Sequence, residues 1–86
     1  MRGRGLTEDA FAILTCLPCE PAGVALSDLD EDYGESIVSR ALVKIEAKYG
    51  LVRWIEDQRP FLAIPATSWE QASYDADVWW KKNLQK

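Results

Sequence analysis

Apolar residues near the start of the chain recur at the spacing of an amphipathic helix. The first such stretch carries Ala10, Phe11, Ile13, Leu14 and Leu17. Thr7 precedes the stretch and has a side chain suited to an N-cap, and Glu8 and Asp9 follow where the helix dipole favours negative charge. Pro18 cannot continue a helix. The pattern therefore predicts a first helix over residues 8–17.

A second periodic stretch lies in the middle of the chain. Its apolar stripe consists of Val38, Ala41, Leu42, Ile45 and Tyr49. This pattern predicts a helix from residue 35 or 36 to residue 49, closed by Gly50. A shorter helix is expected over residues 28–33, with Ser27 as its N-cap, Asp30 completing a pair like a capping box, and Gly34 ending it. Residues 24–26 suit a short edge strand.

The pattern then changes from helical to extended. Residues 51–55 and 61–64 are rich in β-branched and aromatic side chains and predict the two strands of a hairpin. Residues 56–60 are expected to form the turn between them, and Pro65 to end the sheet. A last helix over residues 68–84 is predicted, with Thr67 and Glu70 as the two ends of a capping box.

The last predicted helix has an unusual aromatic content. One broad face holds Trp69, Ala72, Ala76, Trp79, Trp80 and Asn83. Within it we expect Trp69, Ala72, Ala76 and Trp80 to form the inner stripe, with Trp79 pointing elsewhere. Two interpretations stay open. The tryptophans fill a small core, or Trp79 and Trp80 form a protein interface that pairs this helix with a second copy of the chain.

Length and composition favour a single domain. The chain has 86 residues, of which 48% are hydrophobic. We expect a flexible arm over residues 1–5, a domain over residues 6–64, and a C-terminal helix in residues 65–86 that packs on the domain or serves in dimerisation. No apolar run approaches the roughly 20 residues that a membrane span needs. No signal-peptide pattern follows the basic start. These features predict a cytoplasmic protein without membrane contact.

Charge is unevenly distributed along the chain. The formal net charge is −4, which is unusual for a protein that binds nucleic acid. Residues 6–36 contain eight acidic residues and no basic one. Residues 37–59 contain five basic residues against three acidic ones, and the tail adds Lys81, Lys82 and Lys86. The chain is therefore acidic overall with a mildly basic middle.

Two cysteines, Cys16 and Cys19, form a CxxC pair. The chain has no histidine, so a closed tetrahedral zinc site within one chain would need two carboxylate ligands. We interpret both as small apolar residues at the end of the first helix in a reducing compartment. A metal or a disulfide shared between two chains is the alternative. The sequence also lacks a glycine-rich phosphate loop, so we expect neither catalysis nor a cofactor.

The stretch ALSDLDEDYGESIVSRALVKIEAKYGLVRWIEDQRPFLAI resembles the winged helix-turn-helix family. The similar features are the LSDL opening of the second helix, the turn at Gly34, the S-x-V-S-R-A-L-x-x-I rhythm that starts at Ser36, and YGLV over residues 49–52. The resemblance covers residues 6–64. It implies a mainly α fold with a small β-hairpin: a three-helix core, a wing and an additional C-terminal helix. It also implies that helix 36–49 reads the major groove of DNA.

Helical geometry indicates which side chains would face the DNA. At about 100° per residue, Ser36, Arg40, Val43 and Ala47 lie opposite the apolar stripe, flanked by Ser39 and Lys44. Arg40 suits a guanine edge or a phosphate, the serines suit phosphates at the helix start, and Lys44 suits the backbone. The family resemblance adds Arg59 as a contact at the tip of the wing. The alternative is that these charged side chains only solvate the helix.

Two functional hypotheses follow. The first is a dimeric DNA-binding regulator of transcription or replication from a bacterium or phage, which contacts double-stranded DNA through the residues above. Arg2, Arg4 and the lysines of the tail would hold neighbouring phosphates. The second is an acidic winged-helix interaction module, or a phage-type inhibitor, that docks on a basic nucleic-acid-binding partner through Asp30, Glu31 and Asp32. Val43 and Ala47, which contact only thymine methyl groups, and the acidic second helix weigh against the first hypothesis. We favour DNA binding.

Overall fold

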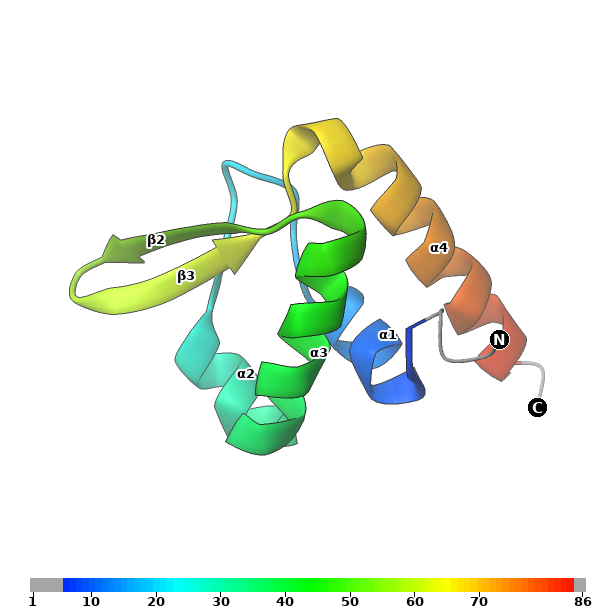
Figure 1. Ribbon diagram of the computed structural model, residues 1–86, viewed down its shortest axis with the longest axis horizontal. Coiled ribbons are helices and arrows are strands. Elements are labelled where there is room, and N and C mark those ends of the chain that lie inside the picture. The colour runs from blue at the N-terminus through cyan, green and yellow to red at the C-terminus, as the bar shows by residue number, and fades with distance from the viewer. Residues whose placement is uncertain (1–5, 85–86) are drawn as a thin grey trace.

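The computed structural model describes residues 6–84, which form a mainly helical fold with a small antiparallel sheet (Figure 1). The elements in chain order are α1 (Glu8–Leu14), β1 (Val24–Ala25), α2 (Leu26–Tyr33), α3 (Glu35–Tyr49), β2 (Val52–Glu56), β3 (Arg59–Ala63) and α4 (Ala66–Leu84). Within residues 6–84, no helix is both long enough and apolar enough to cross a membrane.

The three strands lie in the order β1-β3-β2, and both pairings are antiparallel. Val24 of β1 pairs with Leu62, and Trp54 of β2 pairs with Phe61. The edge strand expected at residues 24–26 is thus confirmed, with its last residue beginning α2 instead. Figure 1 shows the β2–β3 hairpin extending away from the helices, while α4 lies at the opposite end of the molecule.

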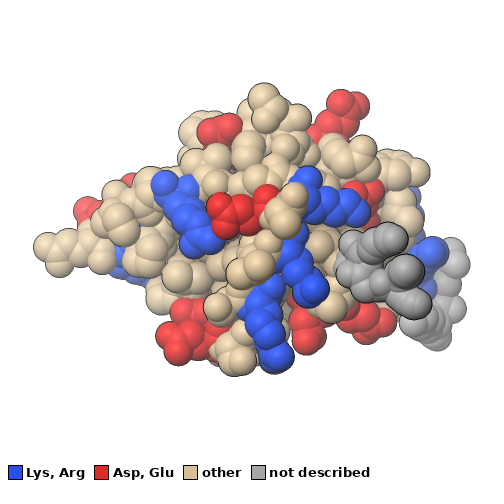
Figure 2. Space-filling view, in the orientation of Figure 1, with Lys and Arg blue, Asp and Glu red and all other residues tan. Residues whose placement is uncertain are grey.

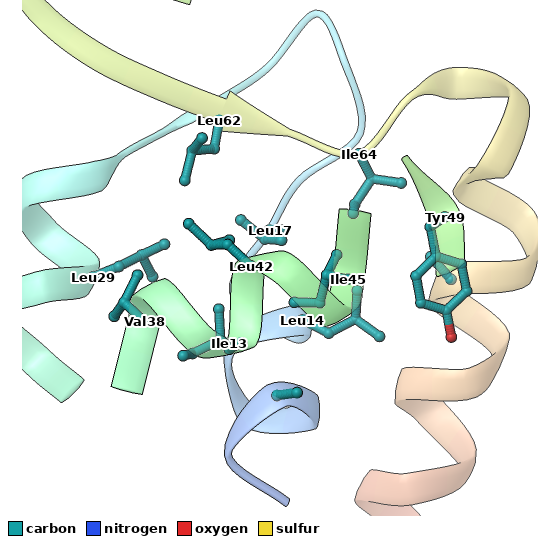
Figure 3. Packing of buried hydrophobic residues seen from close by; sticks show 13 residues of the cluster. Ile13, Leu14, Leu17, Leu29, Val38, Leu42, Ile45, Tyr49, Leu62 and Ile64 are labelled. Atoms are coloured by element: carbon teal, nitrogen blue, oxygen red, sulfur yellow. The ribbon is translucent and has the colours of Figure 1, made fainter. Parts of the chain in front are cut away.

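The core is built where α1, α3 and the sheet meet. All five residues of the predicted α3 stripe are buried, from Val38 to Tyr49. Figure 3 shows these side chains against Ile13 and Leu14 of α1 and against Leu62 and Ile64, with Tyr49 at the side nearest α4. Because one stripe of α3 contacts three other elements, its opposite face is left towards solvent.

The α1 helix ends at Leu14 rather than at the predicted residue 17. The Cys16 N–H donates to the carbonyl of Ile13, and the Leu17 N–H to that of Leu14, so the chain tightens into a narrower turn. Pro18 disfavours the α conformation at Leu17, which explains the early end. Thr7 does act as the N-cap, since its hydroxyl accepts from the Ala10 N–H.

The predicted caps of α2 and α4 are wrong. The α2 helix begins at Leu26 directly after β1, with Ala25 at the N-cap and no side-chain cap from Ser27 or Asp30. The α4 helix begins at Ala66, so Thr67 lies inside its first turn. Glu20 accepts the Ala66 N–H at 2.7 Å in place of the predicted capping box. In both cases a neighbouring element, not a local motif, determines where the helix starts.

The hairpin turn is tighter than the five residues expected. Asp57 and Gln58 form a two-residue turn, and both have positive φ, 53° and 64°. Two central residues with positive φ match the twist of the flanking strands, and Asp tolerates this conformation without glycine. Arg59 therefore begins β3 opposite Glu56, and the strand reaches Ala63.

Candidate nucleic-acid interface

The outward face of α3 carries five of the six residues predicted to contact DNA. All five are exposed: Ser36, Ser39, Arg40, Val43 and Lys44. They lie on the side of the helix opposite the buried stripe, as the rotation of about 100° per residue requires. The helix is held from behind by the core, so these side chains sit on a fixed element. Such rigidity favours a recognition surface over an adaptable loop.

One edge of this face is basic. Arg40, Lys44 and Lys48 follow one another at intervals of four residues, and we call them the basic edge. Arg40 and Lys44 line a shallow hollow with Thr7 and Asp9 at the start of α1. Figure 2 shows Lys and Arg side chains in a band over α3, with acidic side chains on both sides of it.

The charges of the basic edge differ in how they are paired. Within residues 6–84, no carboxylate lies within ion-pair distance of Arg40 or Lys44. Lys48 lies 3.9 Å from Asp75 and stacks over the Tyr49 ring. Asp75 also accepts the Tyr49 hydroxyl, and burial together with this hydrogen bond raises the pKa of Tyr49. Arg40 and Lys44 are thus the cations of α3 best placed to meet an external anion.

The opposite edge of α3 is acidic. Asp30, Glu35 and Glu46 lie along it, and we call them the acidic edge. Glu46 pairs with Arg53 of β2 at 3.2 Å, which partly neutralises it. Asp30 and Glu35 are among the residues that line a groove of about 480 Å³ between α2, α3 and the hairpin, whose apolar lining includes Leu42. The electrostatic field therefore changes sign across the width of α3.

Small and apolar side chains occupy the ridge between the two edges. Ser36, Val43 and Ala47 are all exposed, and Val43 exposes 67% of its surface. Ile55 of the hairpin is similarly exposed, at 69%. Ile55 was not predicted to be exposed, because an isoleucine in a predicted strand is expected to face the core. Its exposure follows from how far the hairpin extends beyond the helices (Figure 1). A ridge of short side chains lets the helix backbone approach a surface closely.

Arg59, the expected contact at the wing tip, begins β3 at the end of the hairpin, and its side chain is directed towards α2. It follows the turn and its guanidinium bonds the Ser27 hydroxyl at 3.1 Å, with Asp28 at 3.8 Å. The same group lies over the Phe61 ring. Arg59 therefore pins the hairpin to α2 and offsets part of the charge of that helix. Glu31 and Asp32 of α2 are exposed, whereas Asp30 is half-buried.

The two tryptophans predicted as a protein interface have different environments. Trp79 is half-buried and stacks on Phe11 of α1 with ring centroids 5.7 Å apart. Trp80 exposes 50% of its surface. The expected order, with Trp80 inside and Trp79 pointing elsewhere, is therefore wrong. Trp79 faces the interior because α4 packs against Phe11 of α1 through this side chain.

Both cysteines are free in this structure. The Cys16 thiol is exposed and lies 3.4 Å from the Tyr33 hydroxyl. This hydrogen bond, with burial, raises the pKa of Tyr33 to about 12. In the described part of the chain, no group of three or more acidic, Cys or His side chains is arranged to hold a metal ion.

Some predicted phosphate contacts are not part of the described surface. Arg2, Arg4 and Lys86 lie outside residues 6–84. Lys81 pairs with Asp77 at 3.1 Å on α4.

Comparisons with protein-family models, with curated proteins and with solved structures gave no match. The functional proposal therefore rests on the surfaces described above.

Proposed function

We propose that this chain is a winged helix-turn-helix protein that binds double-stranded DNA, with α3 lying in the major groove. The observation that carries the proposal is the outward face of α3. There, no carboxylate of residues 6–84 lies within ion-pair distance of Arg40 or Lys44, and a ridge of short side chains lies beside them. An α-helix with its side chains has a diameter of about 10–12 Å, which fits the major groove of about 12 Å width. Control of transcription or replication is a role that suits a protein with a helix in the major groove.

Each part of the face has a distinct task in this proposal. The ridge of Ser36, Val43 and Ala47 approaches the base edges, where Val43 contacts a thymine methyl group. Arg40 reaches a guanine edge or a nearby phosphate, and Lys44 binds the backbone. Ser39 meets a phosphate beside Arg40.

The acidic edge determines how α3 would be oriented. Phosphates on the side of α2 would be repelled by Asp30 and Glu35, so the helix is expected to tilt its basic edge towards one strand. Arg53 reduces the repulsion from Glu46. This arrangement predicts modest affinity with a shallow salt dependence, because few phosphates are neutralised.

The direct test is selection of binding duplexes from a random pool at low salt, together with the DNA upstream of the chain's own coding sequence. Affinity for a selected duplex is then measured by fluorescence anisotropy. Arg40→Ala should cost about 1–3 kcal/mol, which is roughly five- to 150-fold, if Arg40 binds a base edge. Gln71→Ala is the control, because Gln71 is exposed on α4 and lies outside the proposed DNA-binding face. Failure to select any duplex, or equal losses for both variants, would refute the proposal.

A second candidate function is docking on a basic protein through α2. Two observations favour it: the exposed carboxylates Glu31 and Asp32, and the groove beside α2 whose rim includes Asp30 and Glu35. A cationic partner would place aliphatic groups in this groove and its charges on the carboxylates. The test measures binding of a lysine-rich peptide to the wild type and to the triple variant Asp30→Ser, Glu31→Ser, Asp32→Ser. Unchanged peptide binding in the triple variant would rule this candidate out.

A further inference from the structure

The α4 helix exposes more large apolar surface than any other described element. Five large hydrophobic side chains are exposed in residues 6–84, and Tyr74, Val78 and Trp80 belong to α4. Trp80 stands beside a groove of about 350 Å³ between α1 and α4, which we call the α1–α4 groove. Leu14 and Leu17 line it from the side of α1, and the lining from α4 consists of Trp69, Ala72, Ser73, Ala76, Asp77 and Trp80 itself. An apolar protrusion next to an apolar hollow is typical of a contact surface.

We infer that the α1–α4 groove is the interface of a symmetric homodimer, in which Trp80 of each copy enters the groove of the other. A twofold interface requires one surface to hold both a protrusion and the hollow that receives it. Trp80 and the neighbouring groove satisfy this condition on a single face of α4. Small side chains at positions 72, 73 and 76 let the partner's indole approach the helix closely. The inference does not depend on DNA binding.

The charges of α4 favour a second copy in an antiparallel orientation. Glu70 lies in the first part of α4, Asp77 lies in its second half and pairs with Lys81 of the same helix, and Lys81 and Lys82 occupy the last turn. Two antiparallel copies bring the lysines of one helix beside Glu70 of the other. A parallel pair would place like charges together. The helix dipoles also oppose one another in the antiparallel arrangement.

Pairing through this groove leaves the proposed DNA-binding face accessible. Among the described residues, none that lines the α1–α4 groove belongs to α3, whose outward face is the proposed DNA-binding surface. The dimer would therefore present two copies of α3 related by a twofold axis. Such a dimer suits a palindromic site if DNA is bound, and it forms equally in the absence of DNA.

Sedimentation velocity across a wide concentration range tests the inference. The wild type is expected to show a species of twice 9.7 kDa whose fraction rises with concentration. Trp80→Ser should raise the dimer dissociation constant by about thirtyfold or more, since a central tryptophan is a hot spot worth about 2 kcal/mol. Tyr74→Ser is the matched control, because Tyr74 is exposed on another face of the same helix. It should leave the dimer intact.

A second variant separates loss of the interface from loss of folding. Ser73→Arg places a charge in the groove without removing an apolar side chain, and circular dichroism verifies that each variant remains helical. Both Trp80→Ser and Ser73→Arg should be folded monomers at concentrations where the wild type is dimeric. A wild type of 9.7 kDa at every concentration would overturn the inference. So would folded variants that dimerise as the wild type does.

Discussion

Trp54 links the hairpin to the loop that leads into β1. Its ring stacks on Phe61 with centroids 6.0 Å apart, and its indole N–H donates to Glu56. The far edge of the ring lies against the backbone of Gly23, where a Cβ would clash with the Cη2 and Cζ2 atoms. The absence of a side chain at Gly23 is therefore a packing requirement, independent of its backbone dihedrals.

Gly23→Ala should reduce the free energy of unfolding by about 1–3 kcal/mol, because the added methyl group overpacks a site held by two stacked rings. Urea denaturation followed by circular dichroism measures the change. The same substitution in a Trp54→Leu background should cost much less, since the clashing ring is gone. Equal costs in both backgrounds would show that Trp54 is not the cause.

Tyr49 links α3 to α4 through its hydroxyl, which donates to Asp75. Burial, followed by this hydrogen bond, raises its pKa above the ordinary value of 10.0. A raised pKa means that the folded state keeps its proton after the unfolded chain has lost it. The stability that this provides is complete below pH 10.0 and is lost as the pH rises above it.

Tyr49→Phe should lower stability at neutral pH by about 1.5–3 kcal/mol, because the hydrogen bond to a carboxylate is lost. The variant should also lose less stability than the wild type above pH 10.0. Thermal unfolding at a series of pH values measures both effects. Tyr74→Phe is the control, because Tyr74 is exposed and should show neither effect. A decline with pH as steep in Tyr49→Phe as in the wild type would contradict the interpretation.

At the scale of elements, the start of α4 is fixed by Glu20, which is distant in sequence. The Ile64 N–H donates to the Pro18 carbonyl, and the Glu20 N–H donates to the Ile64 carbonyl, so the two segments run side by side. This pairing holds the Glu20 carboxylate against the first amide of α4. A carboxylate at that position accepts a hydrogen bond from an otherwise unpaired N–H and interacts favourably with the positive end of the helix dipole.

Glu20→Ala should therefore cost about 1 kcal/mol of stability, as the loss of an N-cap does. Thr67→Ala and Glu70→Ala remove the residues of the expected capping box and should each cost less. Chemical denaturation of the three variants under identical conditions provides the comparison. If Thr67→Ala were the most damaging of the three, the local box would be the real cap.

The elements also show which features could be predicted from sequence. The buried α3 stripe and the exposed positions Ser36, Ser39 and Arg40 were predictable, because the period of 3.6 residues relates spacing directly to faces. The caps at Ser27 and Thr67 were not, since Ala25 is fixed by the sheet and Ala66 by Glu20. Arg59, Ile55 and Trp79 depend on how far the hairpin reaches and where α1 lies. Such tertiary relations leave no trace in local spacing.

At the scale of the whole molecule, the distribution of charge determines what α3 can do. A net charge of −4 repels DNA at long range, and screening by salt reduces that repulsion as well as the local attraction. On α3, Arg40 and Lys44 are the cations without an ion-pair partner in the described chain. Binding therefore depends on orienting this edge towards one phosphate strand.

The most direct test is the salt dependence of affinity for a selected duplex, compared between the wild type and the double variant Arg40→Ala, Lys44→Ala. The logarithm of the wild-type association constant should fall linearly with the logarithm of salt concentration, and the slope should shrink by about 2 in the double variant if both cations bind phosphate. A slope smaller by about 1, with a general loss of affinity, assigns Arg40 to a base edge. No binding at the lowest salt, or an unchanged slope and affinity, would contradict the proposal that α3 binds DNA.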